Sequence, residues 1–479
     1  MKIIGWILLA IFGVLILLLT AALIRTLLLP KKRSEWKPER DFEREEHFGE
    51  KLAEMVRVET VSRKGEEQRE KFLAFHRVLE ELFPLVHERL EKTEIDGNLL
   101  FFWKGKSGDR PLVLMAHQDV VPAEGIWTHA PFSGDIAEGK VWGRGSADIK
   151  GSLFAIFQAV EELLQEGVVP DQDVYLSSSC TEEVGGDGCP KLVEEMKRRG
   201  VRPYLVCDEG GAIVLDPLAG VKGSYAMIGV LEKGMGNLRI VARSNGGHSS
   251  TPTKKSPIAR LAAFVSDLEK HEPMKAEFEP EAEAMFRTIA LYGPFYYRLL
   301  FGNLWLFRPL LIRIMPRLSA EAAAILRTTI AFTMQSGSEA ENVLPQEAGL
   351  TINLRYIPHQ GADESNRIIE SYARKHGLEV EVLSAYDASK PVSVESEAYH
   401  LVEKVIEEAF PGLPSCPYVM TGGTDARFYQ EICDACIRFT PIVYGPEQMK
   451  GMHGLNENID LFSLTGAVTY FKTLVRRNS

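Results

Sequence analysis

Several residues that could bind metal or move protons stand directly after short apolar runs. The stretch SSSCTEEVGGDG, Ser177–Gly188, places Glu182 and Glu183 side by side, after a predicted strand and before glycines that turn the chain. Similar segments carry the other candidates: His117 and Asp119 in AHQDVVP, Asp148 in GRGSADIKG, Asp208 in VCDEGG, and His453 in GMHGLNE. Histidine and carboxylate are common zinc ligands. This set exceeds the needs of one tetrahedral ion and suits two ions that share a carboxylate.

Each candidate also has an ordinary interpretation when it is taken alone. A His-x-Asp pair is commonly a simple polar pair, Asp148 could cap a helix, and adjacent glutamates are commonly solvated. Their shared position at strand ends favours a site. In an open α/β sheet, ligands bind beyond the carboxyl ends of the strands, where these loops would meet.

The elements that must position these residues alternate between strand and helix. Pro111–Ala116, Asp173–Cys180 and Tyr204–Cys207 have the composition of buried strands, and Ser152–Gly167 has helical periodicity that ends on glycine. This alternation predicts an α/β fold with a mostly parallel sheet covered by helices.

The pattern changes near Gly223, where half-polar strands such as NLRIVARS and GLTINLRYIPH flank a helix. We therefore predict a membrane anchor over residues 1–30, a catalytic domain over 44–223 and 357–479, and an inserted α+β domain over 224–356.

The N-terminus predicts a membrane-spanning helix. Ile3–Ile24 carries no charge, and at about 1.5 Å per helical residue it spans roughly 33 Å, enough to cross a bilayer core. A cleaved signal peptide is the alternative, but its apolar region is normally about 7–15 residues long. We expect a single uncleaved anchor and a body outside the membrane.

Composition excludes some classes of function. The chain has 479 residues, of which 45% are hydrophobic and 25% charged, as in ordinary globular proteins. Its net charge of −11 argues against a nucleic-acid-binding protein. The six cysteines lack the spacing of a disulfide framework, and CDAC (Cys433–Cys436) has redox-motif spacing without a second pair for a zinc site. Buried thiols are the favoured interpretation.

The motifs LMAHQDVVP, GRGSADIKG, CTEEVGG, GGHSSTP, ENVLP, GGTDAR and MHGLNE occur together and in this order. In this the chain resembles the aminoacylase/carboxypeptidase family of di-zinc metallopeptidases, from about Phe48 to the C-terminus. It is most similar to the branch of carboxypeptidase S and the N-fatty-acyl-amino-acid synthase/hydrolase. The resemblance implies two zinc ions, a catalytic domain and an inserted lid or dimerisation domain.

The resemblance also implies a role for each motif residue. The metal and catalytic residues are His117 and Asp208 on one zinc, Glu183 and His453 on the other, Asp148 as the bridge, Asp119 behind His117, Glu182 as general base, and His248 as oxyanion donor from a partner subunit. The substrate residues are Arg355 for a free carboxylate, Asn342, Gly423, Thr424, and Arg427 as a second clamp. The ordinary alternatives are a helix-capping loop histidine for His248 and a surface strand arginine for Arg355.

The implied function is cleavage, or the reverse formation, of the amide bond of N-acyl amino acids, by a homodimer. The apolar segment Pro294–Arg317 contains arginines, which favours a position at a membrane surface and a preference for long acyl groups. The family's lumenal and secreted members suggest a non-cytoplasmic body. The alternatives are a Gly-x type carboxypeptidase or dipeptidase and, in another class, a non-catalytic membrane-tethered binding protein.

Overall fold

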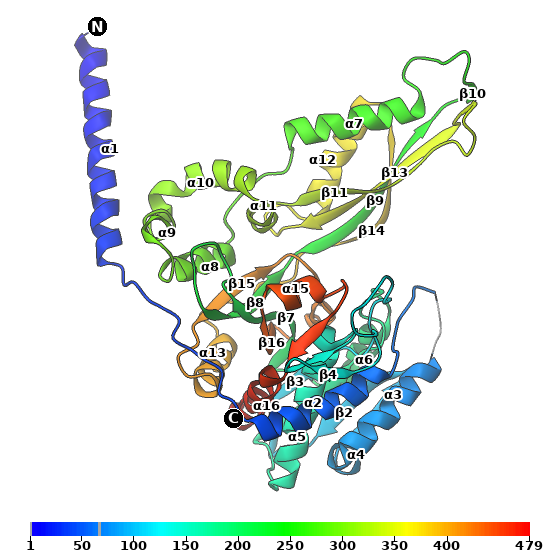
Figure 1. Ribbon diagram of the computed structural model, residues 1–479. Coiled ribbons are helices and arrows are strands. Elements are labelled where there is room, and N and C mark those ends of the chain that lie inside the picture. The colour runs from blue at the N-terminus through cyan, green and yellow to red at the C-terminus, as the bar shows by residue number, and fades with distance from the viewer. Residues whose placement is uncertain (1, 66–68) are drawn as a thin grey trace.

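The computed structural model describes residues 2–65 and 69–479, and a large and a small sheet organise the body of the molecule (Figure 1). The large sheet has eight strands in the order β1-β2-β6-β3-β7-β16-β8-β15. The pairs β6–β3, β3–β7, β7–β16 and β8–β15 are parallel, whereas β1–β2, β2–β6 and β7–β8 are antiparallel. The predicted α/β class is confirmed, but the sheet is mixed rather than mostly parallel. Its strands are β1 (Glu91–Ile95), β2 (Asn98–Trp103), β3 (Ser107–Met115), β6 (Gln172–Ser178), β7 (Leu205–Leu215), β8 (Ser224–Glu232), β15 (Ser415–Met420) and β16 (Cys436–Tyr444).

Helices cover both faces of the large sheet, which explains why its central strands are continuously apolar. Because side chains alternate along a strand, Leu112 and Leu114 face the core formed by α2, α5 and α16, whereas Val113 faces α6 with Leu192. The helices of this domain are α2 (Phe42–Arg57), α3 (Arg69–Leu82), α4 (Pro84–Arg89), α5 (Gly151–Gln165), α6 (Gly188–Arg198), α13 (Glu397–Ala409), α14 (Ala426–Tyr429), α15 (Pro446–Gly451) and α16 (Leu461–Arg477).

The small sheet has four antiparallel strands in the order β11-β13-β9-β14. Helices α7 and α12 cover the face that lies away from the large sheet (Figure 1). Along β9, Leu238 and Ile240 are buried under these helices, and Arg239 lies on the open face between them. The elements are β9 (Gly234–Arg243), α7 (Pro257–His271), β11 (Thr329–Ser336), β13 (Glu347–Tyr356), α12 (Ala362–Lys375) and β14 (Glu379–Tyr386).

Sheet membership differs from the predicted bounds of the inserted domain. Strand β8 lies inside the predicted insert of residues 224–356 but belongs to the large sheet, and all nine of its residues are buried. Elements α12 and β14 follow residue 356 but belong to the small domain, because β14 pairs with β9. Sequence alternation could not assign β14, since any half-exposed strand shows the same pattern.

Between α7 and β11 the chain forms four further helices, which we call the helical insertion (residues 280–326). Its helices are α8 (Pro280–Ala290), α9 (Phe295–Phe301), α10 (Leu304–Leu318) and α11 (Ala320–Leu326). Met285 and Phe286 of α8 share a core with Met227 of β8 and Val419 of β15, so this insertion covers an edge of the large sheet. Helices α9 and α10 are bent by 102° relative to each other.

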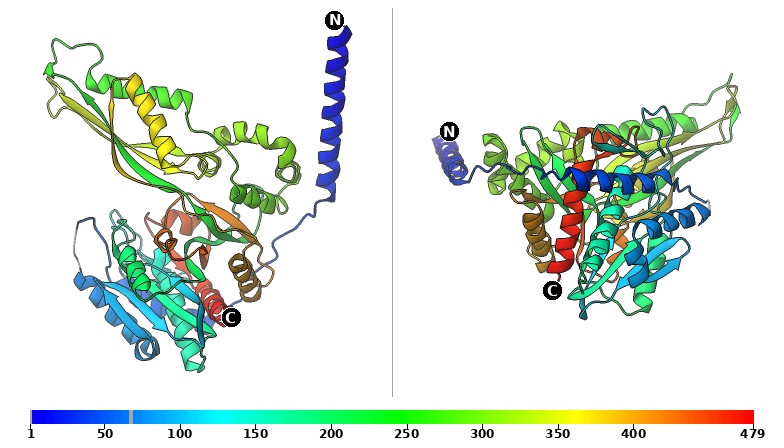
Figure 2. Two further views of the ribbon diagram at one scale, coloured as in Figure 1. Left: turned by 180° about the vertical axis from the view of Figure 1, so that it is seen from behind. Right: turned by 60° about the horizontal axis from the view of Figure 1, so that its bottom comes forward.

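The N-terminal helix α1 (Lys2–Leu28) projects from the body, and the helical insertion lies between it and the sheets (Figures 1 and 2). Its Ile3–Leu28 segment is long and apolar enough to cross a membrane, with a mean hydropathy of 3.1, and only 6% of its most apolar window is buried. Membrane anchors and signal sequences share this length and composition. The end of α1 contacts the insertion, because Asn303 Nδ2 donates to Thr26 Oγ1 at 2.9 Å and to the Ala22 carbonyl at 3.3 Å.

All six cysteines are buried and free, as predicted. Cys433 and Cys436 of the CDAC motif lie in the core beneath α6 and α14. Burial raises the pKa of Cys416, as expected for a thiol in apolar surroundings, and also raises that of Cys207, to about 12. Raised pKa values of this kind are typical of structural thiols.

Candidate dinuclear metal site

The candidate site lies where the strands of the large sheet end. His117 and Asp119 follow β3, Glu182 and Glu183 follow β6, and Glu209 lies within β7. Asp148 lies in the segment Ser146–Lys150, directly before α5, and His453 follows α15. The predicted convergence of separate strand ends at one rim is therefore present in the fold.

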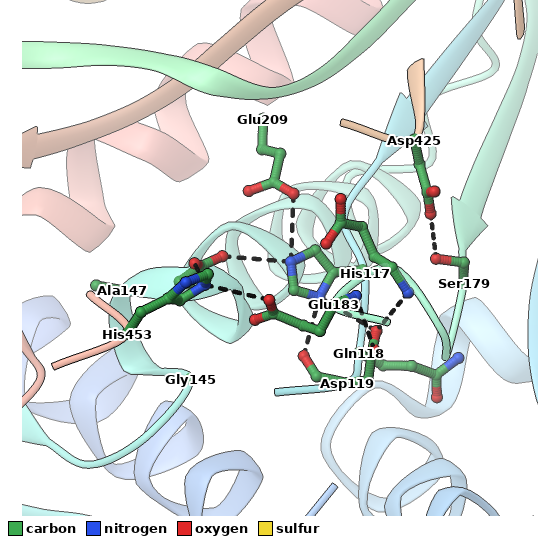
Figure 3. A network of polar contacts seen from close by, with 12 residues as sticks. His117, Gln118, Asp119, Gly145, Ala147, Ser179, Glu183, Glu209, Asp425 and His453 are labelled. Carbon is green, nitrogen blue, oxygen red and sulfur yellow. Dashed lines mark hydrogen bonds and ion pairs between the residues drawn. The ribbon is translucent and has the colours of Figure 1, made fainter. Parts of the chain in front are cut away.

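Asp148 lies between two sets of potential metal ligands. Its Oδ1 is 3.3 Å from His117 Nε2, which is 3.2 Å from Glu209 Oε1. Its Oδ2 is 2.9 Å from His453 Nε2, which is 3.1 Å from Glu183 Oε2. Within each set, the three ligand atoms lie within 4.8 Å of one another. Figure 3 shows His117, Glu183, Glu209 and His453 facing this shared centre.

The electrostatics of this centre fit a bound cation. Burial raises the pKa of Glu209 to about 8 and also raises that of Glu183. Hydrogen bonds to Asp148 and Glu183 raise the pKa of His453 to about 10, so in this arrangement a proton offsets the crowded carboxylates. A divalent ion would supply the same compensation and would displace that proton. The residues present therefore fit a pair of metal ions.

The structure places Glu209, and not the predicted Asp208, among the candidate metal ligands. Asp208 is buried, and its Oδ2 accepts a hydrogen bond from the Ala426 amide at 2.8 Å, on the α14 side of the sheet. The side chains of Glu209 and Cys207 lie on the opposite side of the sheet. This side faces α5, and Asp148 lies directly before that helix. Adjacent strand residues point in opposite directions, so only one of this pair can reach the site. The alternation of apolar residues along β7 is the sequence signal that would have identified Glu209 instead of Asp208.

Asp119 holds the glutamate turn and His117 in place. It is fully buried, and its carboxylate accepts from the backbone amides of Glu182 and Glu183, each at 3.1 Å, and from Ser62 Oγ at 2.6 Å. Its backbone carbonyl lies 2.9 Å from His117 Nδ1. A hydrogen bond to Nδ1 leaves Nε2 free to bind metal, as the predicted role of Asp119 requires.

Glu182 lies outside both ligand sets, and burial raises the pKa of its carboxyl well above the usual range. His117 offsets part of this rise in pKa, whereas Glu209 and Asp425 add to it. A carboxylate with these properties, adjacent to ligand Glu183, suits a general base.

Glu457 is a positioning residue that the sequence analysis missed. Its Oε1 accepts from the backbone amides of Gly145, Ala147 and Asp148 at 2.9–3.0 Å, and its Oε2 accepts from Arg144 at 2.6 Å. Glu457 is fully buried, so this single carboxylate fixes the backbone that presents the shared aspartate. It belongs to the MHGLNE motif, in which only the histidine was given a role.

The predicted substrate residues divide into two groups. Arg355 and Tyr386 stand opposite the same β9 residue, Met235, so their side chains share one face of the small sheet. The Arg427 guanidinium lies 5.1 Å from the centre of the Tyr386 ring, and a Cβ on Gly423 would be 3.1 Å from the Tyr386 hydroxyl. Tyr386 was not predicted, because its strand was not assigned to this sheet.

Thr424 is buried, and its backbone amide and hydroxyl donate to Glu232 at 3.1 and 3.0 Å. It therefore holds the loop that carries Gly423 and leads into α14, where Arg427 lies.

His248 and Asn342 form the second group and lie away from the metal ligands of the same chain. Strands β10 (Gly247–His248) and β12 (Val343–Leu344) pair at the far end of the small domain (Figure 1). The His248 side chain is exposed, and its Nδ1 lies 2.8 Å from Ser250 Oγ. The Asn342 carbonyl accepts from the Ser249 amide at 2.9 Å. One chain alone does not bring these residues to the site.

Known proteins are similar to this chain in sequence and in fold. The chain is 33% identical to the N-fatty-acyl-amino acid synthase/hydrolase PM20D1 of Xenopus tropicalis, over 100% of this chain and 96% of that protein. It is 33% identical to the probable carboxypeptidase S-like 2 of Dictyostelium discoideum, over 85% of this chain and 79% of that protein. The fold matches the M20 family metallo-carboxypeptidase Sso-CP2 of Sulfolobus solfataricus, with a TM-score of 0.68, 18% identity, and coverage of 90% of this chain and 99% of that one.

The family model for peptidase family M20/M25/M40 matches residues 113–477, a range that includes all the metal-ligand candidates. The predicted membership of a metallopeptidase family, in the branch of carboxypeptidase S and the N-fatty-acyl-amino acid enzymes, is confirmed. This chain therefore belongs to peptidase family M20/M25/M40 and is a hydrolase.

Proposed function

We propose that this chain is a di-zinc amidohydrolase that cleaves, or in reverse forms, N-acyl amino acids with long apolar acyl groups. The observation that carries the proposal is the division of the Asp148 carboxylate between His117 on one side and His453 on the other. An aspartate shared in this way suits a pair of ions. Similarity along the whole chain to an N-fatty-acyl-amino acid synthase/hydrolase supports the substrate class.

His117 and Glu209 would hold one ion, Glu183 and His453 the other, and Asp148 both. When bound, the ions supply Lewis-acid activation of water and of the amide carbonyl. Nitrogen and carboxylate ligands without thiolate are compatible with zinc.

Glu182 is the proposed proton carrier. Its carboxylate takes a proton from the attacking water as the water oxygen bonds to the amide carbon. The C–N bond then breaks, and Glu182 returns the proton to the leaving nitrogen, which releases a carboxylic acid and an amino acid. Asp119 holds the Glu182 backbone amide at 3.1 Å and so limits the movement of this base.

Arg355 and Arg427 provide the proposed site for the free carboxylate of the amino acid. Both lie near Tyr386, and both oppose the rise in its pKa that burial causes. A planar guanidinium pairs well with a carboxylate, and two of them beside a tyrosine give a cationic patch. Asn342, Gly423 and Thr424 are proposed to shape this end of the site.

The oxyanion donor is proposed to be His248 of a second copy of the chain. An exposed histidine at the far end of the small domain is suited to reach a neighbour, and a two-fold dimer would exchange the same contact in both directions. A hydrogen-bond donor aimed at the developing negative charge on the carbonyl oxygen lowers the barrier.

The membrane is proposed as a further partner. Helix α1 would anchor the chain, with the body on the non-cytoplasmic side. Trp305 and Leu310 of α10 are exposed, and Arg313 of this helix is also exposed, a combination suited to a membrane surface. The contact of Asn303 with α1 would hold the helical insertion next to the anchor.

The proposed function is tested by comparing N-acyl amino acids and dipeptides as substrates of the full chain loaded with zinc. We expect kcat/KM to rise with acyl length and to exceed the values for dipeptides. A preference for dipeptides would instead support carboxypeptidase activity, the second candidate, which the similarity to a probable carboxypeptidase S-like protein favours.

A further inference from the structure

A cavity of about 680 Å³ begins at the proposed metal ligands. Asp148 and Glu209 belong to its lining, and so do residues of α8 and α11 of the helical insertion. This volume lies in the range of about 300–1,000 Å³ that is typical of small-molecule sites. The cavity is therefore continuous with the reaction centre and large enough for part of a substrate.

The helical insertion contributes a largely apolar part of the lining, in which Glu321 of α11 is the charged residue. Met285, Phe286 and Ile289 of α8 and Ala324 and Ile325 of α11 form the wall opposite the large sheet. None of the described residues that line the cavity is lysine, arginine or histidine. A peptide carboxylate would find no cationic partner in this lining, and Glu321 of α11 would repel it, whereas a hydrocarbon chain would lose its unfavourable contact with water on entering the cavity.

The cavity does not coincide with the apolar segment Pro294–Arg317, from which the sequence predicts a preference for long acyl groups. None of the described residues between 294 and 317 lines it. Trp305 is 47% exposed, and its Nε1 donates to Asn303 Oδ1 at 3.2 Å. The segment instead supports the cavity wall from behind, because Phe286 stacks on Phe301 with ring centres 4.7 Å apart.

We infer that this cavity holds the hydrocarbon chain of the acyl group, with the scissile amide at the end formed by Asp148 and Glu209. The inference rests on the proposed function and deepens it, because it names the acyl subsite and the residues that limit chain length. Each methylene buried in the cavity should raise kcat/KM by about fourfold until the space is full. The helical insertion is then the element that sets acyl preference.

The test measures kcat/KM for acetyl, octanoyl, dodecanoyl and hexadecanoyl derivatives of one amino acid, with the full chain in lipid nanodiscs. Ala324→Phe fills the cavity and should lower kcat/KM for the hexadecanoyl substrate at least about tenfold more than for the acetyl substrate. The matched control is Ala284→Phe, on α8 of the same insertion but outside both the lining and the apolar core beside it, which should keep the wild-type profile. Each substrate partitions into the lipid to the same extent whichever variant is present, so differences in kcat/KM between variants reflect changes in the cavity.

A second variant protects the test against a folding defect in Ala324→Phe. Ile289→Ala enlarges the cavity from the α8 side and should move the optimum to longer chains. Equal losses at all chain lengths in both variants, or the same change in Ala284→Phe, would overturn the inference. Hydrolysis of N-acyl amino acids by the wild type would still support the proposed function. A wild type that cleaves dipeptides and no N-acyl amino acid would overturn the proposed function, and this inference with it.

Discussion

The rim of the large sheet and the far end of the small domain carry the two halves of the proposed chemistry, and they are built differently. At the rim, Asp119 is fully buried and hydrogen-bonds the turn that carries Glu182, while Glu457 holds the backbone of Asp148. At the far end, His248 is exposed and contacts a near neighbour, Ser250. One chain therefore preorganises the candidate metal ligands, whereas His248, the proposed donor to the carbonyl oxygen, would have to come from a second chain.

The largest effect is expected at the rim. Glu182→Gln should lower kcat by about 10²–10⁴-fold because the proton carrier is lost, while metal content stays at the wild-type level. Glu183→Gln is the matched variant one residue away, and it should lose metal as well as activity. Rates and metal analysis on both purified proteins distinguish these outcomes. Normal turnover in Glu182→Gln would rule out its proposed role.

The next effect is expected at the far end. His248→Ala should lower kcat by about 10²–10³-fold without changing metal content or folding. His271→Ala changes another exposed histidine of the small domain and serves as the control. Mixing inactive His248→Ala with inactive Glu182→Gln chains should restore part of the activity, because mixed dimers contain one site with both residues. An active monomer would contradict the proposed role of His248 in the site of a second chain.

A smaller effect is expected from the residue that positions the shared aspartate. Glu457→Gln removes the charge that pairs with Arg144 and should weaken metal affinity about 10–100-fold. Glu447→Gln, which loses an exposed ion pair with Lys140, should change little. Metal titration of the metal-free proteins measures both. Unchanged affinity in Glu457→Gln would show that the backbone of Asp148 is held without it.

The smallest effect is expected where the helical insertion meets α1. Asn303→Ala removes buried hydrogen bonds worth about 1 kcal/mol, so amide exchange in α9 and α10 should be about fivefold faster. Turnover in lipid should change less than about twofold, because the metal ligands are untouched. Asn237→Ala, on the open face of the small sheet, is the control for exchange. Exchange equal to wild type would show that this contact does not hold the two elements together.

The sequence by itself determined most of the rim. Apolar runs that end in histidine or carboxylate predict strand-end loops, and such loops meet at one edge of an α/β sheet whatever its exact strand order. His117, Asp148, Glu183 and His453 therefore came together as expected. The length and apolar composition of α1 were equally evident, because both are local properties of the sequence.

Tertiary structure decided the choices that depend on direction and pairing. Only the orientation of β7 separated Glu209 from Asp208, since adjacent side chains of a strand face opposite sides. Only the pairing of β14 with β9 placed Tyr386 beside Arg355, because the partner of a strand does not follow from its own alternation. The cavity under α8 and α11 likewise depends on how helices from a distant segment pack on the sheet, and no local pattern contains that information.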